Sequence, residues 1–398
     1  MLIILEANLK MIFTNKRTKS SFWLSILLCF QTNVSYAQNT QTASLNMGDI
    51  APVMQLKEWV KGKPITKFEN GMTYVVEFWA TWCMPCKAAM PHLSALADKY
   101  KDSIVVLGID ILENKSKNTS IEKLRKFVES MGQQMDYRVA IQDSNFMETG
   151  WYLPAGGGKL IGVPSSFVVN KDGRIAWIGH PKDLEKVLPK IINNTWDIQD
   201  ALNKRNSAKR LRELDDSLNN VLFQYREDDR IKPEKRGRPD LALLAIDKIV
   251  KSKPELKYAP SIAYHTFSSL LKTNQQKAVE YGKAVLKTPS YEDEPAYNEI
   301  INAIGTNSSK LTLLKEIFQL GAEACQMKIG YITYPEIHDM DKEYHKMADW
   351  YWLAKNKYKA IAAEQEAIVA LKSKIDFSKT KLAEYELALR KYSSGINQ

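Results

Sequence analysis

The chain reads MTYVVEFWATWCMPC from Met72 to Cys86, a strand-like run that leads directly into two cysteines three positions apart. A helix-like run, Lys87 to Tyr100, follows. Two thiols at this spacing at the start of a helix can meet as a disulfide. Because a helix N-terminus presents unpaired N–H groups and a partial positive charge, the thiolate of Cys83 is electrostatically favoured. The pattern predicts redox chemistry with Cys83 as the nucleophile and as the more exposed thiol.

Other uses of a cysteine pair fit this chain less well. A zinc ribbon needs a second pair, and the remaining cysteines, Cys29 and Cys325, are isolated. A c-type haem site needs a histidine where the chain has Lys87. A peroxidatic cysteine needs no resolving partner three residues on, so that class does not account for Cys86. Two inert core cysteines fit poorly with Pro85 between them at a helix start. We therefore expect thiol–disulfide exchange, with no metal and no cofactor.

The sequence EFWATWCMPC, Glu77 to Cys86, resembles the active-site run of thioredoxin-fold proteins, and specifically of the TlpA/ResA-like extracytoplasmic thiol-disulfide oxidoreductases. A second segment, GVPSSFVVNKDGRI from Gly162 to Ile175, resembles the cis-proline loop, strand and hairpin of that family. The resemblance implies an α/β thioredoxin-like fold, a central mixed sheet flanked by helices, over residues 47–195.

The resemblance also implies the roles of the catalytic residues. Cys83 attacks a disulfide of a partner protein, and Cys86 resolves the mixed disulfide, leaving a Cys83–Cys86 disulfide. Glu77 stands where thioredoxins carry a buried Asp, so its desolvated carboxylate would have a raised pKa and accept the Cys86 proton. The alternative is an exposed glutamate at the strand end.

The substrate-binding surface follows from the same resemblance. Pro164 is expected to be cis, which leaves the backbone of Val163 free to pair with an extended substrate. An apolar rim is expected around the disulfide, although one of its two tryptophans is as easily placed in the core. The rim residues are Trp79, Trp82, Met84 and Pro85. Many family members carry a Glu three positions after the second cysteine, whereas this chain has Ala89, so no role of that acid is carried over.

Local patterns predict the other elements of the redox domain. Short β-branched runs predict strands over residues 104–110, 137–141, 167–170 and 174–178. Thr119 or Ser120 could cap a helix that begins at Ile121, and a further helix is expected over residues 183–192. The glycine-rich stretch from Gly150 to Gly162 predicts a loop.

Residues 1–37 are predicted to form a secretory signal peptide. Three basic residues precede an apolar run of nine, and Ser35-Tyr36-Ala37 offers small residues for cleavage. The mature chain would begin at Gln38, with residues 38–46 as a short linker, and either Met1 or Met11 could be the start. We therefore expect an exported protein in a periplasmic or other extracytoplasmic compartment.

Residues 196–398 show helical periodicity, and we expect an all-helical, tetratricopeptide-like domain. The segment IVKSKP, from Ile249 to Pro254, returns as VLKTP, from Val285 to Pro289, about one such period later. Cys325 is expected to be buried and inert. His338 and His345 lie seven residues apart, and we expect no metal there.

Composition limits the partners. The 398 residues carry a net charge of +10 with acidic residues interleaved, and no basic stripe with aromatic residues indicates nucleic-acid binding. The expected partners are disulfide-containing or dithiol proteins, with a membrane electron donor if the protein acts as a reductant. The alternatives are a disulfide oxidant or isomerase, or a redox-regulated helical-repeat scaffold that binds proteins.

Overall fold

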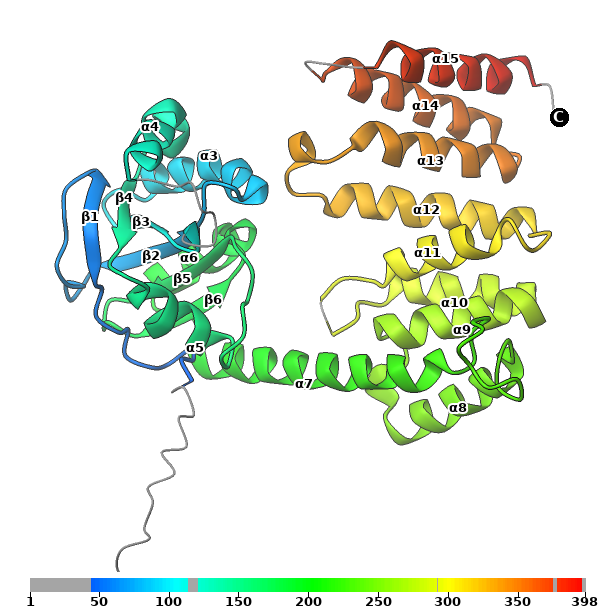
Figure 1. Cartoon of the computed structure of the whole chain (residues 1–398), viewed down its shortest axis with the longest axis horizontal. Coiled ribbons are helices and arrows are strands. Elements are labelled where there is room, and N and C mark those ends of the chain that lie inside the picture. The colour runs from blue at the N-terminus through cyan, green and yellow to red at the C-terminus, as the bar shows by residue number, and fades with distance from the viewer. Residues whose placement is uncertain (1–43, 114–120, 292, 375–377, 396–398) are drawn as a thin grey trace, which may run out of the picture. The chain divides into compact units, whose positions relative to one another are not determined.

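The computed structural model describes residues 44–113, 121–291, 293–374 and 378–395 (Figure 1). The predicted signal peptide and the predicted caps Thr119 and Ser120 lie outside these ranges. Leu45–Gln398 form one compact unit. Leu45 is buried in the redox core and its N–H donates to Pro154 O, so ordered packing begins within the predicted linker. Within the described part of the chain, no helix has the length and apolarity to span a bilayer.

A six-stranded mixed sheet forms the redox domain, as predicted. Its spatial order is β1-β4-β3-β2-β5-β6. The central strands β2, β3 and β4 are parallel, whereas β5 pairs antiparallel with β2, and β1 and β6 form the edges. The strands are β1 (Leu56–Lys61), β2 (Thr73–Trp79), β3 (Ile104–Asp110), β4 (Arg138–Gln142), β5 (Ser165–Val169) and β6 (Ile175–Gly179). The sequence did not reveal β1, because a charged edge strand lacks the apolar run of a central one.

The side chains of β2 alternate between the two faces of the sheet, and this alternation positions the site. Phe78 faces an aromatic cluster, with ring centroids 5.2 Å from Phe167 and 6.3 Å from Trp151. Trp79 faces the opposite side and stacks on Phe127 of α4 (Ile121–Met131). Lys87 of α3 (Met84–Lys99) lies over the same Phe127 ring. The odd-numbered residues of β2 therefore face α3 and α4.

Two local predictions need correction. Helix α3 begins at Met84 rather than at Lys87, because Cys83 is the N-cap and Pro85 occupies the first turn, where it costs no hydrogen bond. The predicted loop from Gly150 to Gly162 begins with a π-helical turn, Glu148–Tyr152, and a short helix α5, Leu153–Ala155. Trp151 and Tyr152 are fully buried, so core packing overrides the glycine-rich signal here.

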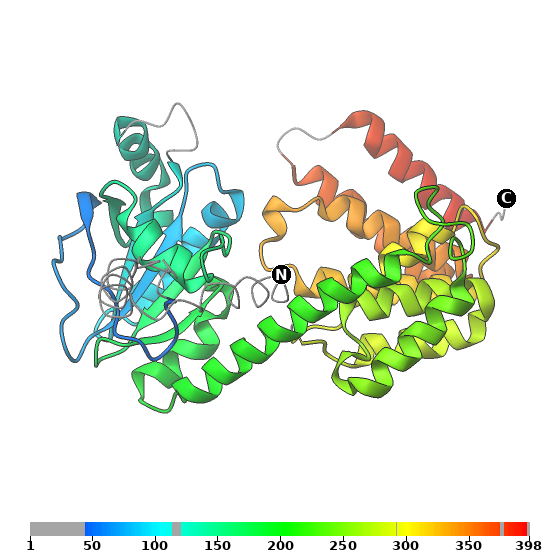
Figure 2. The same cartoon turned by 60° about the horizontal axis from the view of Figure 1, so that its bottom comes forward.

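The described residues from 196 onward contain helices and turns but no strand, which agrees with the predicted all-helical region (Figure 2). The helices are α7 (Ile198–Phe223), α8 (Pro239–Ser252), α9 (Pro260–Thr273), α10 (Gln275–Lys287), α11 (Tyr297–Asn307), α12 (Lys315–Tyr331), α13 (Met340–Leu353), α14 (Lys357–Lys372) and α15 (Lys379–Ser394), after α6 (Leu184–Ile192) of the redox domain. The two similar sequence segments end α8 and α10, so they are equivalent helix ends. The tetratricopeptide assignment itself stays a prediction.

Candidate active site

Cys83 and Cys86 form a disulfide at the N-terminus of α3. Cys83 caps the helix, and its Sγ accepts a hydrogen bond of 3.2 Å from the Cys86 backbone N–H. The same sulfur lies 3.5 Å from the carbonyl oxygen of Val163, which precedes Pro164 in a cis peptide bond. The two segments that carried the resemblance, 80 residues apart, therefore meet at one sulfur atom. A backbone donor and a helix N-terminus both stabilise negative charge on Cys83.

The rim around the disulfide is uneven. Trp82 and Met84 are 54% and 53% exposed, and Pro85 is also exposed, as a substrate-binding rim requires. Trp79 is 1% exposed and packs in the core, so it is not part of the rim. The reason is strand alternation, which directs its side chain toward α4.

The predicted difference in exposure between the two cysteines is absent. Cys83 is 3% exposed and Cys86 is 2% exposed in the disulfide form. Cys83 thus lies almost covered between two exposed neighbours.

Glu77 is buried, as the resemblance implied, and the alternative of an exposed glutamate is excluded. It is 1% exposed, and burial raises the pKa of its carboxyl to about 8, with a smaller opposing effect of a hydrogen bond from Ser166. Ser166 Oγ donates to one carboxylate oxygen, whereas Oε1 has no hydrogen-bond partner among the described residues. A carboxyl with this pKa changes its protonation state in the range where thiols ionise.

The face that holds Glu77 also carries polar groups that sequence reasoning missed. Ser166 of β5 lies directly opposite Glu77 of β2. The signal in the sequence for this contact was a serine in a buried strand beside the expected cis-proline. Tyr137 is buried, its hydroxyl has no partner among the described residues, and burial followed by the charge of Glu77 raises its pKa well above the usual value. Gly108, opposite Glu77 in β3, leaves the necessary room, because a Cβ there would lie 2.9 Å from the Tyr137 ring.

A second buried carboxyl lies at the end of β3. Asp110 is 4% exposed, and burial and then the charge of Glu113 raise its pKa well above the usual value. Glu113 accepts a hydrogen bond from the Thr81 backbone N–H, two residues before Cys83. Glu113 thereby holds the segment that enters the helix, and no sequence motif marked either acid.

The other titratable candidates have structural surroundings. His180 caps a short turn by accepting from the Lys182 N–H, and burial lowers its pKa. His345 is hydrogen-bonded to Glu364 within the helical region, while His338 lies in the loop before α13. Cys325 is free and buried, which confirms the predicted burial, and burial raises the pKa of its thiol to about 12.

The helical half contains a cavity of about 640 Å³ that is lined from alternate helices. Its walls include Asn219 of α7, Tyr264 of α9, Asn302 of α11 and Trp350 of α13. Arg226 lies at one side, with its guanidinium over the Tyr264 ring. Most of the described residues that line the cavity are polar, and none of them is a cysteine.

A mixed sheet that places a CxxC disulfide on a helix N-terminus beside a cis-proline defines a thioredoxin-fold redox protein. The thioredoxin family pattern matches residues 64–134. Protein FixW of Rhizobium leguminosarum is 31% identical over 157 residues, which cover 39% of this chain and 69% of that protein. The thiol-disulfide oxidoreductase ResA of Bacillus anthracis is 33% identical over 138 residues, 33% of this chain and 68% of that protein.

Among solved structures, the thioredoxin domain of a thiol-disulfide oxidoreductase from Bacteroides vulgatus is similar to 38% of this chain and to 100% of its own length, with 20% identity and a TM-score of 0.30. The sequence relatives decide the family. The chain belongs to the ResA-like, thioredoxin-fold thiol-disulfide oxidoreductases, and its redox pair is Cys83–Cys86. Proteins that carry dithiols or disulfides are its partners.

Proposed function

We propose that the protein is an exported reductant of disulfides in other proteins. In the first step the Cys83 thiolate attacks one sulfur of the partner disulfide, forming a mixed disulfide and releasing one partner thiolate. In the second step Cys86 loses its proton and attacks Cys83, which releases the second partner thiolate and leaves the Cys83–Cys86 disulfide. The partner gains two electrons, which a dithiol donor must return to the enzyme.

The observation that carries this mechanism is the state of Glu77. Its carboxyl is buried on the sheet face that α3 covers, and its pKa of about 8 makes it a base of suitable strength for the Cys86 thiol. Among the described residues one of its oxygens accepts a hydrogen bond and the other accepts none, which leaves the second oxygen able to accept a proton directly or through water. Glu77 is thus proposed as the proton acceptor of the resolving step.

Substrate binding is proposed for the segments that flank Cys83. Val163 would offer its backbone to an extended substrate strand, and Pro164 would shape that loop. Trp82, Met84 and Pro85 would form the apolar rim, and their exposure supports this role. Such a surface recognises a polypeptide backbone more than a particular side chain.

The reduction potential of the Cys83–Cys86 pair tests the direction of electron flow. Equilibration with glutathione, followed by alkylation and mass analysis, should give a value below about −220 mV, in the range of cytosolic reductants. A value near −120 mV, typical of a strong oxidant, would instead make the protein a disulfide donor. Cell fractionation tests export: the purified exported protein should begin at Gln38, whereas a cytoplasmic chain that retains residues 11–37 would contradict it.

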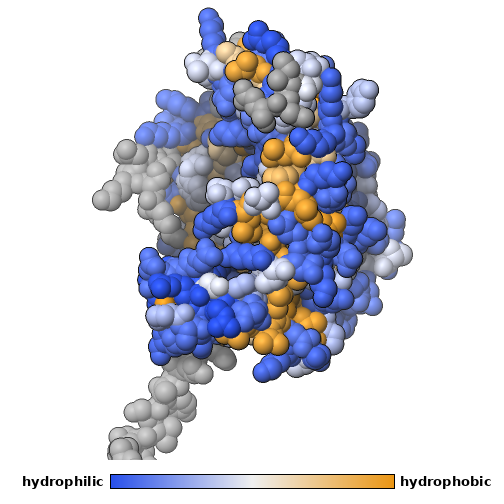
Figure 3. All heavy atoms as spheres, turned by 90° about the vertical axis from the view of Figure 1, so that its right-hand side faces the viewer, coloured by the Kyte–Doolittle hydropathy of each residue, from blue (hydrophilic) through white to orange (hydrophobic). Residues whose placement is uncertain are grey.

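The second candidate is a redox-regulated scaffold, and the cavity between alternate helices favours it. Hydrophobic residues also gather between hydrophilic ones on one face of the helical half (Figure 3). The exposed apolar residues of the helical half include Leu314 and Leu353. If the protein is a scaffold, the Cys83→Ser variant would be inactive in thiol assays yet would keep the partners that the wild type binds. If the protein is a reductant, the same variant would lose turnover and would trap no mixed disulfide.

A further inference from the structure

The loop between α12 and α13, Ile332–Asp339, contacts the redox domain. Its 3₁₀ turn, Pro335–Ile337, contacts α3, the helix that begins at the disulfide. Tyr334, just before this turn, is 8% exposed, and its ring centroid lies 6.1 Å from that of His180 in the redox domain. A turn that begins 252 residues after Cys83 therefore contacts the catalytic helix.

The N-terminal end of this loop is attached to both halves of the chain. Tyr331 stacks on Tyr297 with ring centroids 5.5 Å apart, and the Tyr297 hydroxyl donates to Glu294. Glu294 in turn lies 3.4 Å from the Lys182 ammonium, two residues after His180. This chain of contacts holds the loop beside the redox domain.

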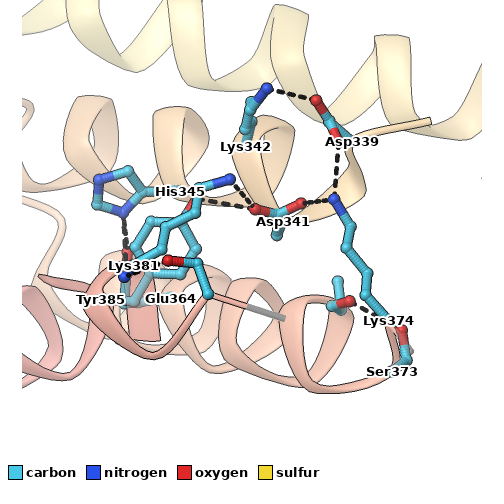
Figure 4. A network of polar contacts seen from close by, with 11 residues as sticks. Asp339, Asp341, Lys342, His345, Glu364, Ser373, Lys374, Lys381 and Tyr385 are labelled. Atoms are coloured by element: carbon cyan, nitrogen blue, oxygen red, sulfur yellow. Dashed lines mark hydrogen bonds and ion pairs between the residues drawn. The ribbon is translucent and has the colours of Figure 1, made fainter. Parts of the chain in front are cut away.

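The C-terminal end of the loop is fixed by an ion network around the buried Asp341 (Figure 4). Asp339 and the fully buried Asp341 both pair with Lys374 at 2.7 Å. Asp341 also pairs with Lys381 of α15 and accepts a hydrogen bond from the Tyr385 hydroxyl. Because both ends are held, the position of Tyr334 between them is determined by the packing of the helical array.

The surroundings of Tyr334 are unusual in two respects, its buried hydroxyl and its electrostatic interaction with Glu77. Its hydroxyl is buried with no hydrogen-bond partner among the described residues, an arrangement that proteins seldom tolerate. Burial first, and then the negative charge of Glu77, raises the pKa of Tyr334, so the ring lies within electrostatic reach of the proposed proton acceptor. Meanwhile Cys83 is 3% exposed although its neighbours Trp82 and Met84 are more than half exposed.

We propose that Tyr334 is a specificity-determining residue whose ring forms one wall of the entrance to Cys83. The entrance admits small disulfides and extended polypeptide segments, which reach the sulfur along the Val163 backbone, and it slows compact folded proteins whose disulfides cannot enter. This inference rests on the proposed exchange reaction, and it assigns to the helical half a direct part in substrate choice.

The test compares two disulfides in the full-length reduced protein: glutathione disulfide, which is small, and native insulin, which is compact. Tyr334→Ala should raise the second-order rate constant with insulin at least tenfold and change that with glutathione disulfide less than threefold. Tyr334→Phe keeps the ring and should keep the wild-type ratio of the two rate constants. Tyr358→Ala is the matched control, since Tyr358 is an 86% exposed tyrosine at the start of α14.

Alkylation of Cys83 supplies a readout that does not depend on exchange. In the reduced protein, Tyr334→Ala should accelerate labelling by a 5-kDa polyethylene glycol maleimide far more than labelling by iodoacetamide. An unchanged ratio for both reagents and both disulfides in a folded Tyr334→Ala protein would overturn the proposal, as would equal relaxation in Tyr334→Phe. If Tyr334→Ala unfolds, Tyr334→Leu, which also shortens the side chain, must show the same selective gain. Wild-type protein inactive toward both disulfides would refute the proposed function instead, while the labelling ratio would still report on the entrance.

Discussion

Two fully buried carboxyls in this protein have opposite surroundings. Glu77 in the redox sheet has one hydroxyl donor and one oxygen without a hydrogen-bond partner among the described residues, and burial raises its pKa to about 8. Asp341 in the helical array faces Lys374, Lys381 and the Tyr385 hydroxyl. Burial also opposes its charge, but these donors outweigh burial and its pKa is lowered.

The difference shows how one kind of group is used for chemistry or for structure. A buried carboxyl with few donors is near the balance between its charged and neutral forms, so it can exchange a proton. A buried carboxyl surrounded by cations stays charged and joins the elements that carry them. In the redox domain, burial therefore disfavours the charged form of Glu77. In the helical array, cations offset the burial of Asp341, and the resulting network fixes α13, α14 and α15.

The largest expected effect distinguishes Cys83 from Cys325. Cys83→Ser should lower the rate of insulin reduction by at least 10³-fold, because a hydroxyl neither ionises near neutral pH nor forms a disulfide. Cys325→Ser, the control in the helical half, should leave the rate unchanged, because that thiol is buried with a pKa of about 12. Residual activity above a tenth of wild type in Cys83→Ser would show that another group carries the exchange.

The second effect concerns the resolving step. Glu77→Gln should slow the attack of Cys86 on a mixed disulfide about 10²-fold, because the variant cannot accept the Cys86 proton, and it should leave the first attack by Cys83 nearly unchanged. Stopped-flow tryptophan fluorescence after mixing with a disulfide substrate separates the two phases. Asp341→Asn is the control and should alter neither phase. Resolution at the wild-type rate from pH 6 to pH 9 would remove Glu77 from the mechanism.

The third effect concerns stability, and here Asp341 is the residue tested. Asp341→Asn should lower the free energy of unfolding by about 2 kcal/mol, less than the loss for a fully buried pair because Lys374 and Lys381 remain partly exposed. Urea denaturation followed by circular dichroism measures this loss. Asp247→Asn, which breaks a surface pair with Lys251 in α8, should be close to neutral. Equal losses in the two variants would mean that the buried network does not fix the array.

The smallest effect is a pH dependence. The folded-state pKa of Glu77 is raised from 4.5 to about 8, so between these values the folded protein binds more protons than the unfolded chain. Stability from this group is therefore greatest at low pH and falls as pH rises toward 8. Between pH 6 and pH 7 the loss is about 1.4 kcal/mol for one proton. Glu77→Gln should remove this contribution, and denaturation curves that keep the same slope in wild type and variant would contradict the raised pKa.

Short-range patterns in the sequence were sufficient for the frame of the redox domain. An apolar β-branched run followed by two cysteines and a helical run determines the strand and the helix, because each depends on neighbours within a few residues. The same applies to the helices after residue 196, whereas the cis-proline was expected from the family resemblance. The alternation of β2 also placed Phe78 and Glu77 on opposite faces before any partner was known.

What only the tertiary structure decided is which groups meet. Ser166 is 89 residues from Glu77, and Tyr334 is 257 residues from it, yet strand pairing and the packing of the helical array bring both within range of its carboxyl. Trp79 and Cys83 look equally accessible in a linear motif, and the elements around them bury both. Burial and electrostatic partners depend on chain segments far apart in sequence. Periodicity and spacing therefore determined the reactive pair and most elements, β1 excepted, but not the access to the pair or the acidity of its neighbours.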